Sequence, residues 1–225
     1  MAVILCIETT TTNCSVAISK SGLLLGLKEY DSSGYSHAEK LHVFINELLT
    51  ECGLTIDQLD AIAVSKGPGS YTGLRIGVST AKGLAFSLAI PLISVATLQS
   101  LAKKVKAEKN SAIIAMLDAR RMEAYTAVFD EDNQQLLNTE ATILEKDSFE
   151  ELFTAKENIY CVGNAVQKFA GLLGENSTIS FTEANPSARE MVSLAFNKYK
   201  ISDTEDVAYF EPYYLKDFIV TKKKV

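Results

Sequence analysis

An apolar strand, a glycine-rich turn and a long helix with almost no charge follow one another between residues 60 and 89. The turn occupies residues 67–70 (Gly-Pro-Gly-Ser), and the only charged residues from 71 to 91 are Arg75 and Lys82. A helix this apolar has to be covered on more than one side. A strand that passes into such a helix through a short turn is typical of an α/β fold.

Small residues recur at every fourth position of this helix, at Gly73, Gly77, Ala81 and Ala85. Residues four apart lie on one helix face, so they form a ridge that another backbone can approach closely. The ridge leaves two interpretations open. Either the helix lies at the centre of this chain's own core, or another chain buries one of its faces.

Hydrophobic spacing predicts further strands and helices on both sides of this stretch. A helix over 36–50 is expected to begin in a Ser-x-x-Glu capping box at Ser36 and Glu39. After residue 110 the pattern starts again, and it ends with a capped helix over 188–200. Further predicted strands are 3–8, 14–19, 23–29, 91–95, 112–117, 123–129, 134–144, 159–163 and 179–181, and Thr97 is expected to cap a short helix.

Each half of this pattern begins with a strand that ends in an acidic residue, Glu8 in the first and Asp118 in the second. A hairpin follows each strand, which indicates a weak internal duplication. No linker rich in Pro, Gly or Ser separates the halves, so we expect two closely packed subdomains with a cleft between them. The predicted subdomains are 1–100 and the smaller 101–225, with the helix near 188–200 folding back onto the first.

The composition restricts the compartment and the partners. No apolar run approaches the roughly 20 residues of a transmembrane helix, and the first residues lack the basic segment of a secretory signal. The four cysteines form no C-x-x-C pair, as expected of buried thiols in the cytoplasm. A net charge of -6 argues against a protein that grips nucleic acid by itself. The basic run Lys222–Lys224 is interpreted as a solvated tail.

The glycine-rich turn can in principle hold an anion, because free N–H groups and the positive end of the helix dipole point into it. It is not a Walker loop, since no Lys follows the last glycine, and it is one residue longer than the dinucleotide fingerprint. It also lacks the flanking glycines of a nucleophile elbow. The alternative is a purely structural turn. The candidate phosphate- or nucleotide-facing residues are Glu8, Thr9, Thr10, Gly67, Gly69 and Ser70.

Four motifs together resemble the bacterial TsaB (YeaZ) family. They are Ile-Glu-Thr-Thr at 7–10, Gly-Pro-Gly-Ser-Tyr-Thr-Gly-Leu-Arg-Ile-Gly at 67–77, Leu-Asp-Ala-Arg at 117–120 with Glu123 and Tyr125, and Glu-Pro-Tyr-Tyr-Leu-Lys at 211–216. The second motif is the specific one, and together the motifs span nearly all 225 residues. The resemblance implies an α/β fold of two actin-like (ASKHA, ribonuclease H-like) subdomains, each a mixed sheet with helices.

The resemblance also implies membership of a complex with TsaD, the catalytic paralogue, and TsaE, an ATPase. That complex transfers threonylcarbamoyl from an adenylate intermediate to N6 of adenosine 37 in transfer RNAs that read codons beginning with A. This chain is expected to be a non-catalytic scaffold or activator without a cofactor of its own, while the complex uses ATP and Mg²⁺. We expect a homodimer when the chain is alone, tRNA binding mainly through the complex, and no membrane contact.

Docking to TsaD is expected through the helices near 36–50 and 71–89, which would form a helix bundle between the chains. The same surface would serve the homodimer. The predicted interface residues are Leu41, Phe44, Ile45, Gly73, Arg75, Gly77, Ala81 and Lys82.

No metal site and no catalytic residue are predicted. The catalytic paralogue holds a metal with a His-x-x-x-His pair, whereas the two histidines here, His37 and His42, are five apart. On one helix they would point about 140° apart, at 100° per residue. Two enzymatic alternatives stay open. An ATPase or phosphotransferase of the same superfamily would use Glu8, Thr9, Thr10 and the glycine-rich turn, and a glycoprotease-like peptidase would need a catalytic set that the spacing does not indicate.

Overall fold

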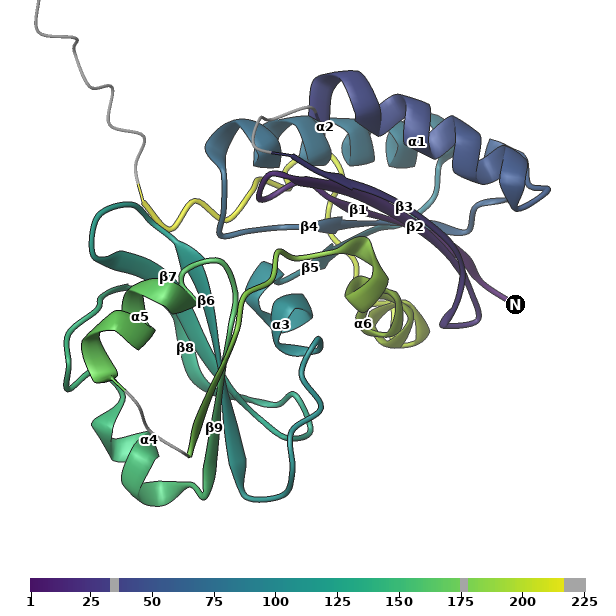
Figure 1. Cartoon of the computed structure of the whole chain (residues 1–225). Helices are drawn as coiled ribbons and strands as arrows, with labels where there is room; N and C mark the ends of the chain where they lie inside the picture. The colour runs from purple at the N-terminus through teal and green to yellow at the C-terminus, as the bar shows by residue number, and fades with distance from the viewer. Residues whose placement is uncertain (33–36, 175–177, 217–225) are drawn as a thin grey trace, which may run out of the picture.

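The computed structural model describes residues 1–32, 37–174 and 178–216, which form two five-stranded sheets (Figure 1). The strands of the first sheet are β1 (Val3–Glu8), β2 (Asn13–Lys20), β3 (Leu23–Asp31), β4 (Ala61–Ser65) and β5 (Leu92–Val95). Their order across the sheet is β3-β2-β1-β4-β5. The central strand β1 is antiparallel to β2 and parallel to β4.

The second sheet repeats this connectivity. Its strands are β6 (Ser111–Asp118), β7 (Glu123–Asp130), β8 (Gln135–Ile143), β9 (Asn158–Val162) and β10 (Ile179–Thr182), in the order β10-β9-β6-β7-β8. Its first strand, β6, is again central, antiparallel to β7 and parallel to β9. The two mixed sheets confirm the predicted α/β architecture of two similar parts.

Helices cover both faces of the first sheet. The α-helices that pack on the two sheets are α1 (His37–Glu51), α2 (Tyr71–Leu88), α3 (Thr97–Ala102), α4 (Glu150–Ala155), α5 (Val166–Leu173) and α6 (Ala188–Lys200). Figure 1 shows α1 and α2 side by side on one face and α6 on the other. All six residues of β1 are buried, and they alternate between the two layers: Leu5 and Ile7 pack towards α1 and α2, Ile4 and Cys6 towards α6. A strand covered on both faces needs a continuous apolar run, which explains the sequence of β1.

The second sheet is covered by α5 and α4 on one face and by α3 on the other. Phe169 of α5 is fully buried in a cluster with Ile114 and Cys161, while Leu98 and Leu101 of α3 pack with Ile113 and its neighbours on the opposite side. Because α6 returns to the first sheet, the chain crosses between the two parts more than once. The predicted boundary between residues 1–100 and 101–225 stays a prediction.

The predicted capped start of α6 is confirmed, the cap predicted at Thr97 is wrong, and α2 has a serine cap that was not predicted. The side chains of Ser70 and Ser187 accept hydrogen bonds from Gly73 N and Arg189 N, which is the usual role of an N-cap serine. Thr97 lies inside α3, and its hydroxyl contacts Ser65 instead of capping the helix. The proposed cap Ser36 of α1 lies outside the described residues, as do Lys222–Lys224.

Candidate functional site

The glycine-rich turn packs against the connection between β1 and β2. The backbone N–H of Ser70 donates to the carbonyl oxygen of Thr10 over 2.7 Å, and the Thr9 hydroxyl donates to the carbonyl oxygen of Gly73 over 2.8 Å. A methyl group at Gly69 would lie 2.6 Å from the Thr10 oxygen, and one at Gly73 would lie 2.0 Å from the Thr9 oxygen. The absence of side chains at Gly69 and Gly73 therefore lets the backbone of Thr9 and Thr10 pack closely against the start of α2.

The carboxyl group of Glu8 is enclosed at the same place. Its Oε1 accepts hydrogen bonds from the Thr10 N–H over 2.7 Å and from the Thr10 hydroxyl over 2.5 Å. Within the described part of the chain, Oε2 has no hydrogen-bond partner. Burial raises the pKa of Glu8 above its ordinary value, against the lowering effect of the hydrogen bonds from Thr10. Such a carboxyl stabilises the turn that follows β1, and burial disfavours its charged form.

These contacts bear on the two interpretations of the turn, as an anion site or as a structural turn, and the anion site stays a prediction. The six candidate residues do converge, but Glu8, Thr9 and Thr10 are buried and fill the space in front of the turn. The oxygens that face Gly69 and Gly73 are backbone carbonyls, which repel phosphate. On its other side the turn is held by Thr97, whose hydroxyl accepts from Gly67 N over 3.1 Å. The geometry therefore favours the structural alternative for this turn.

A chain of hydrogen bonds links the two parts of the molecule near these strand ends. Asn185 donates to Asp31 Oδ2 over 2.7 Å and accepts from Asn164 Nδ2 over 3.0 Å. Asn164 Oδ1 in turn accepts from the backbone N–H of Asp118 over 2.8 Å, at the end of β6. This chain of hydrogen bonds fixes the ends of the two sheets relative to each other.

The structure separates the predicted interface residues into core and surface positions. Leu41, Ile45, Gly73, Gly77 and Ala81 are buried within this chain. They are therefore core positions, and the prediction that another chain covers them needs correction: their neighbours on the outer face have to carry any contact. The physical reason is that the buried stripe of each helix packs on the first sheet and on Thr9.

The two basic residues of α2, Lys82 and Arg75, form hydrogen bonds with the C-terminal segment, residues 203–216. Lys82 Nζ donates to the carbonyl oxygens of Phe210 over 2.8 Å and Ala208 over 3.2 Å. The Arg75 guanidinium lies over the Tyr71 ring, 4.2 Å from its centroid, and Nε donates to the Tyr214 hydroxyl over 3.4 Å. Both cations thus fasten a strap of the same chain along α2.

The outer face of α1 and α2 exposes two large apolar side chains that the sequence reasoning missed. Phe86 is 81% exposed and Val43 is 47% exposed, while Phe44 is half-buried against the core. The other exposed residues of α2 are Arg75 and four small uncharged residues, Thr72, Ser79, Gly83 and Ser87. We name this face the α1–α2 surface. Phe86 could have been singled out, because it falls outside the four-residue repeat of the buried ridge.

The two histidines do not converge. His37 is buried with Nε2 2.7 Å from the Thr11 carbonyl oxygen, and burial lowers its pKa; His42 is exposed. In the described ranges no three His, Cys, Asp or Glu side chains group closely enough to hold a metal ion. Over the same ranges no helix has the length and apolar character of a membrane span.

The family model of TsaD, tRNA N6-adenosine threonylcarbamoyltransferase, matches residues 32–224. The TsaB protein of Escherichia coli, a tRNA threonylcarbamoyladenosine biosynthesis protein, is 30% identical over 98% of this chain and 97% of its own length. TsaB of Bacillus subtilis is 29% identical over 95% of this chain and 93% of its own length. Among solved structures, YeaZ from Pseudomonas aeruginosa is 25% identical with a TM-score of 0.77, over 96% of this chain and 100% of that one. The chain belongs to the TsaB family of tRNA threonylcarbamoyladenosine biosynthesis proteins, within the wider family that the TsaD model describes.

Proposed function

We propose that this chain is a non-catalytic, cytoplasmic subunit that acts with TsaD and TsaE in the threonylcarbamoylation of N6 of adenosine 37 in tRNAs reading codons that begin with A. In this proposal ATP and Mg²⁺ are used by the complex, and this chain binds neither by itself. The chain docks to TsaD through the α1–α2 surface and pairs with a second copy through the same surface when TsaD is absent.

The observation that carries the proposal is the exposure of Phe86 on a helix whose outer face has little charge. Burying an aromatic side chain of this size is a strong contribution to association, and the centres of protein interfaces are depleted in charged residues. The outer face of α1 is richer in charge, with Glu39 and Glu47 exposed, and so suits the polar rim of an interface.

The scaffold role is also supported by how the glycine-rich turn is used. Thr9 and Thr10 occupy the approach to the N-terminus of α2, and Glu8 is enclosed beneath them. A phosphotransferase would need this approach for a phosphate group, so the contacts favour a subunit that presents a rigid helical surface.

The test is the mass of the complex formed with TsaD of the same organism, measured by light scattering with and without nucleotide. We expect a defined heteromer that forms at the expense of the homodimer. Phe86→Asp should weaken that association about ten-fold or more, as expected for loss of a central aromatic contact. The matched control is Ile143→Asp on the edge strand β8, where an apolar side chain is 66% exposed.

Absence of association under both conditions would remove the main support for the proposal. ATP turnover by the chain alone, compared with Glu8→Ala, would then distinguish the phosphotransferase alternative. Equal weakening by Phe86→Asp and Ile143→Asp would show that the effect is general and that the α1–α2 surface is not the docking site.

A further inference from the structure

The turn between β6 and β7 holds two consecutive arginines in the left-handed backbone region. Arg120 has φ 72° and Arg121 has φ 49°, and both residues are exposed. The N–H of Glu123 donates to the Arg120 carbonyl oxygen over 3.1 Å, which closes the hairpin. Positive φ is unfavourable for residues with longer side chains, whereas Asn and Gly adopt it more readily. Backbone strain of this kind is concentrated at functional sites.

The acidic residues next to this turn already have other partners. Asp118 Oδ1 accepts from Lys168 Nζ over 2.8 Å and from the Arg120 N–H over 2.5 Å. Glu123 forms an ion pair with Lys216 of the C-terminal segment. Neither arginine side chain has an ion-pair partner in the part of the chain that the structure describes. The local acids are thus neutralised by lysines, and the two guanidinium groups are left as surplus positive charge.

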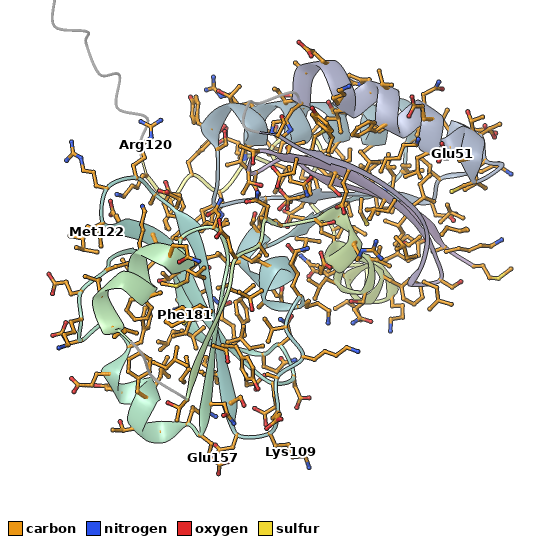
Figure 2. The ribbon with its side chains drawn as sticks, viewed as in Figure 1. Glu51, Lys109, Arg120, Met122, Glu157 and Phe181 are labelled. Carbon is orange, nitrogen blue, oxygen red and sulfur yellow. The ribbon has the colours of Figure 1, made fainter. Side chains whose placement is uncertain are left out.

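The place of this turn sets it apart from other charged surface. Figure 2 shows Arg120 at one end of the second sheet, with Met122 beside the same hairpin, and Lys109 at the opposite end. Met122 is itself exposed. The chain as a whole carries a net charge of -6, and these two arginines are consecutive basic residues without a described ion pair.

We propose that Arg120 and Arg121 bind backbone phosphates of the tRNA substrate. The inference rests on the proposed function, which brings a tRNA to the complex. A guanidinium group binds phosphate oxygens in a bidentate manner and keeps its charge at any physiological pH. Two such groups on a rigid hairpin position an RNA backbone without supplying most of the affinity, which suits an acidic subunit whose partner carries the rest of the RNA contact.

The test uses the assembled complex of full-length chain and TsaD with an unmodified transcript of a tRNA that reads AAN codons. Affinity is measured over a series of salt concentrations. In Arg120→Asn/Arg121→Gly the turn receives the residues that its backbone prefers, so we expect folding stability to be retained or raised. RNA affinity should fall about ten-fold near 0.1 M salt, and the slope of log K against log salt should become shallower by about 1.5, for two lost phosphate contacts.

Two further variants separate the position from the charge. Lys106→Gln/Lys109→Gln removes the same charge from the segment before β6 and should leave both RNA affinity and slope close to wild type. Arg120→Lys/Arg121→Lys keeps the charge and should retain most of the salt slope. Wild-type affinity in Arg120→Asn/Arg121→Gly, or an equal loss in the Lys106/Lys109 variant, would overturn the inference.

Light scattering on the same samples keeps this inference distinct from the proposed function. If Arg120→Asn/Arg121→Gly no longer assembles with TsaD, the hairpin is a protein contact and the RNA inference is wrong. If the wild-type chain does not assemble with TsaD, the proposed function fails first. If assembly is normal and RNA affinity is unchanged by the variant, only the RNA inference fails.

Discussion

Adding one methyl group at Gly73 tests how tightly α2 is packed on the β1–β2 connection. The new carbon would lie 2.0 Å from the Thr9 carbonyl oxygen and 3.2 Å from its carbon, so either α2 or the connection has to move. Backbone atoms cannot rotate away as a flexible side chain can. The movement would also disturb the Thr9–Gly73 and Ser70–Thr10 hydrogen bonds.

The magnitude follows from these losses. Overpacking a rigid site costs about 1–3 kcal/mol, and each weakened hydrogen bond costs about 1 kcal/mol. We therefore expect Gly73→Ala to lower the free energy of unfolding by about 3 kcal/mol. For a chain of this length that corresponds to a fall in Tm of roughly 6–12 °C.

Gly83 provides the control on the same helix. A methyl group there has no neighbouring atom within 4 Å among the described residues. Gly83→Ala should raise the free energy of unfolding by about 0.5–1 kcal/mol, because alanine restricts the unfolded chain and favours helix. Gly77→Ala should be intermediate, since its methyl group would meet the Thr9 hydroxyl, 2.2 Å away, which can rotate.

Thermal and urea unfolding followed by circular dichroism would measure all three variants. The expected order of stability is Gly83→Ala, wild type, Gly77→Ala and Gly73→Ala. If Gly73→Ala shifted Tm upward as Gly83→Ala is expected to do, the close contact between α2 and Thr9 would be refuted. The explanation that the small residues of α2 make room for Thr9 would then also be wrong.

Two further predictions concern groups held by the same packing. Burial raises the pKa of Glu8, so the folded state binds a proton more readily than the unfolded state does. Glu8 therefore lowers the free energy of unfolding as the pH rises above 4.5, the ordinary pKa of this carboxyl group. In urea unfolding from pH 4.5 to 8, the difference in unfolding free energy between wild type and Glu8→Gln should move in favour of Glu8→Gln as pH rises; a constant difference would contradict this. Lys82→Met removes the donor to the Phe210 and Ala208 carbonyls and should release the C-terminal segment. Limited proteolysis should then cut within 203–216 several times faster than in wild type or in the exposed-lysine control Lys103→Met, and equal rates would show that Lys82 does not hold the segment.

Local patterns in the sequence were enough to place most of the secondary structure. The apolar run of β1, the serine cap of α6 and the turn before α2 all depend on a few neighbouring residues, so the sequence alone predicts them. The predicted strand at 60–65 and helix at 71–89 differ from β4 and α2 by one residue at an end. The repeated order of strands and helices likewise indicated two similar mixed sheets.

Such patterns do not determine which side of each helix packs against the rest of the chain. A four-residue repeat states that Gly73, Gly77 and Ala81 share a face, but it does not say whether that face meets another chain or the connection at Thr9. The engagement of Lys82 and Arg75 joins residues 126 to 139 positions apart. The exposure of Phe86 and the surplus charge at Arg120 depend in the same way on the position of distant segments. Spacing along a helix is a local property, whereas burial and charge pairing are set by which elements the fold brings together.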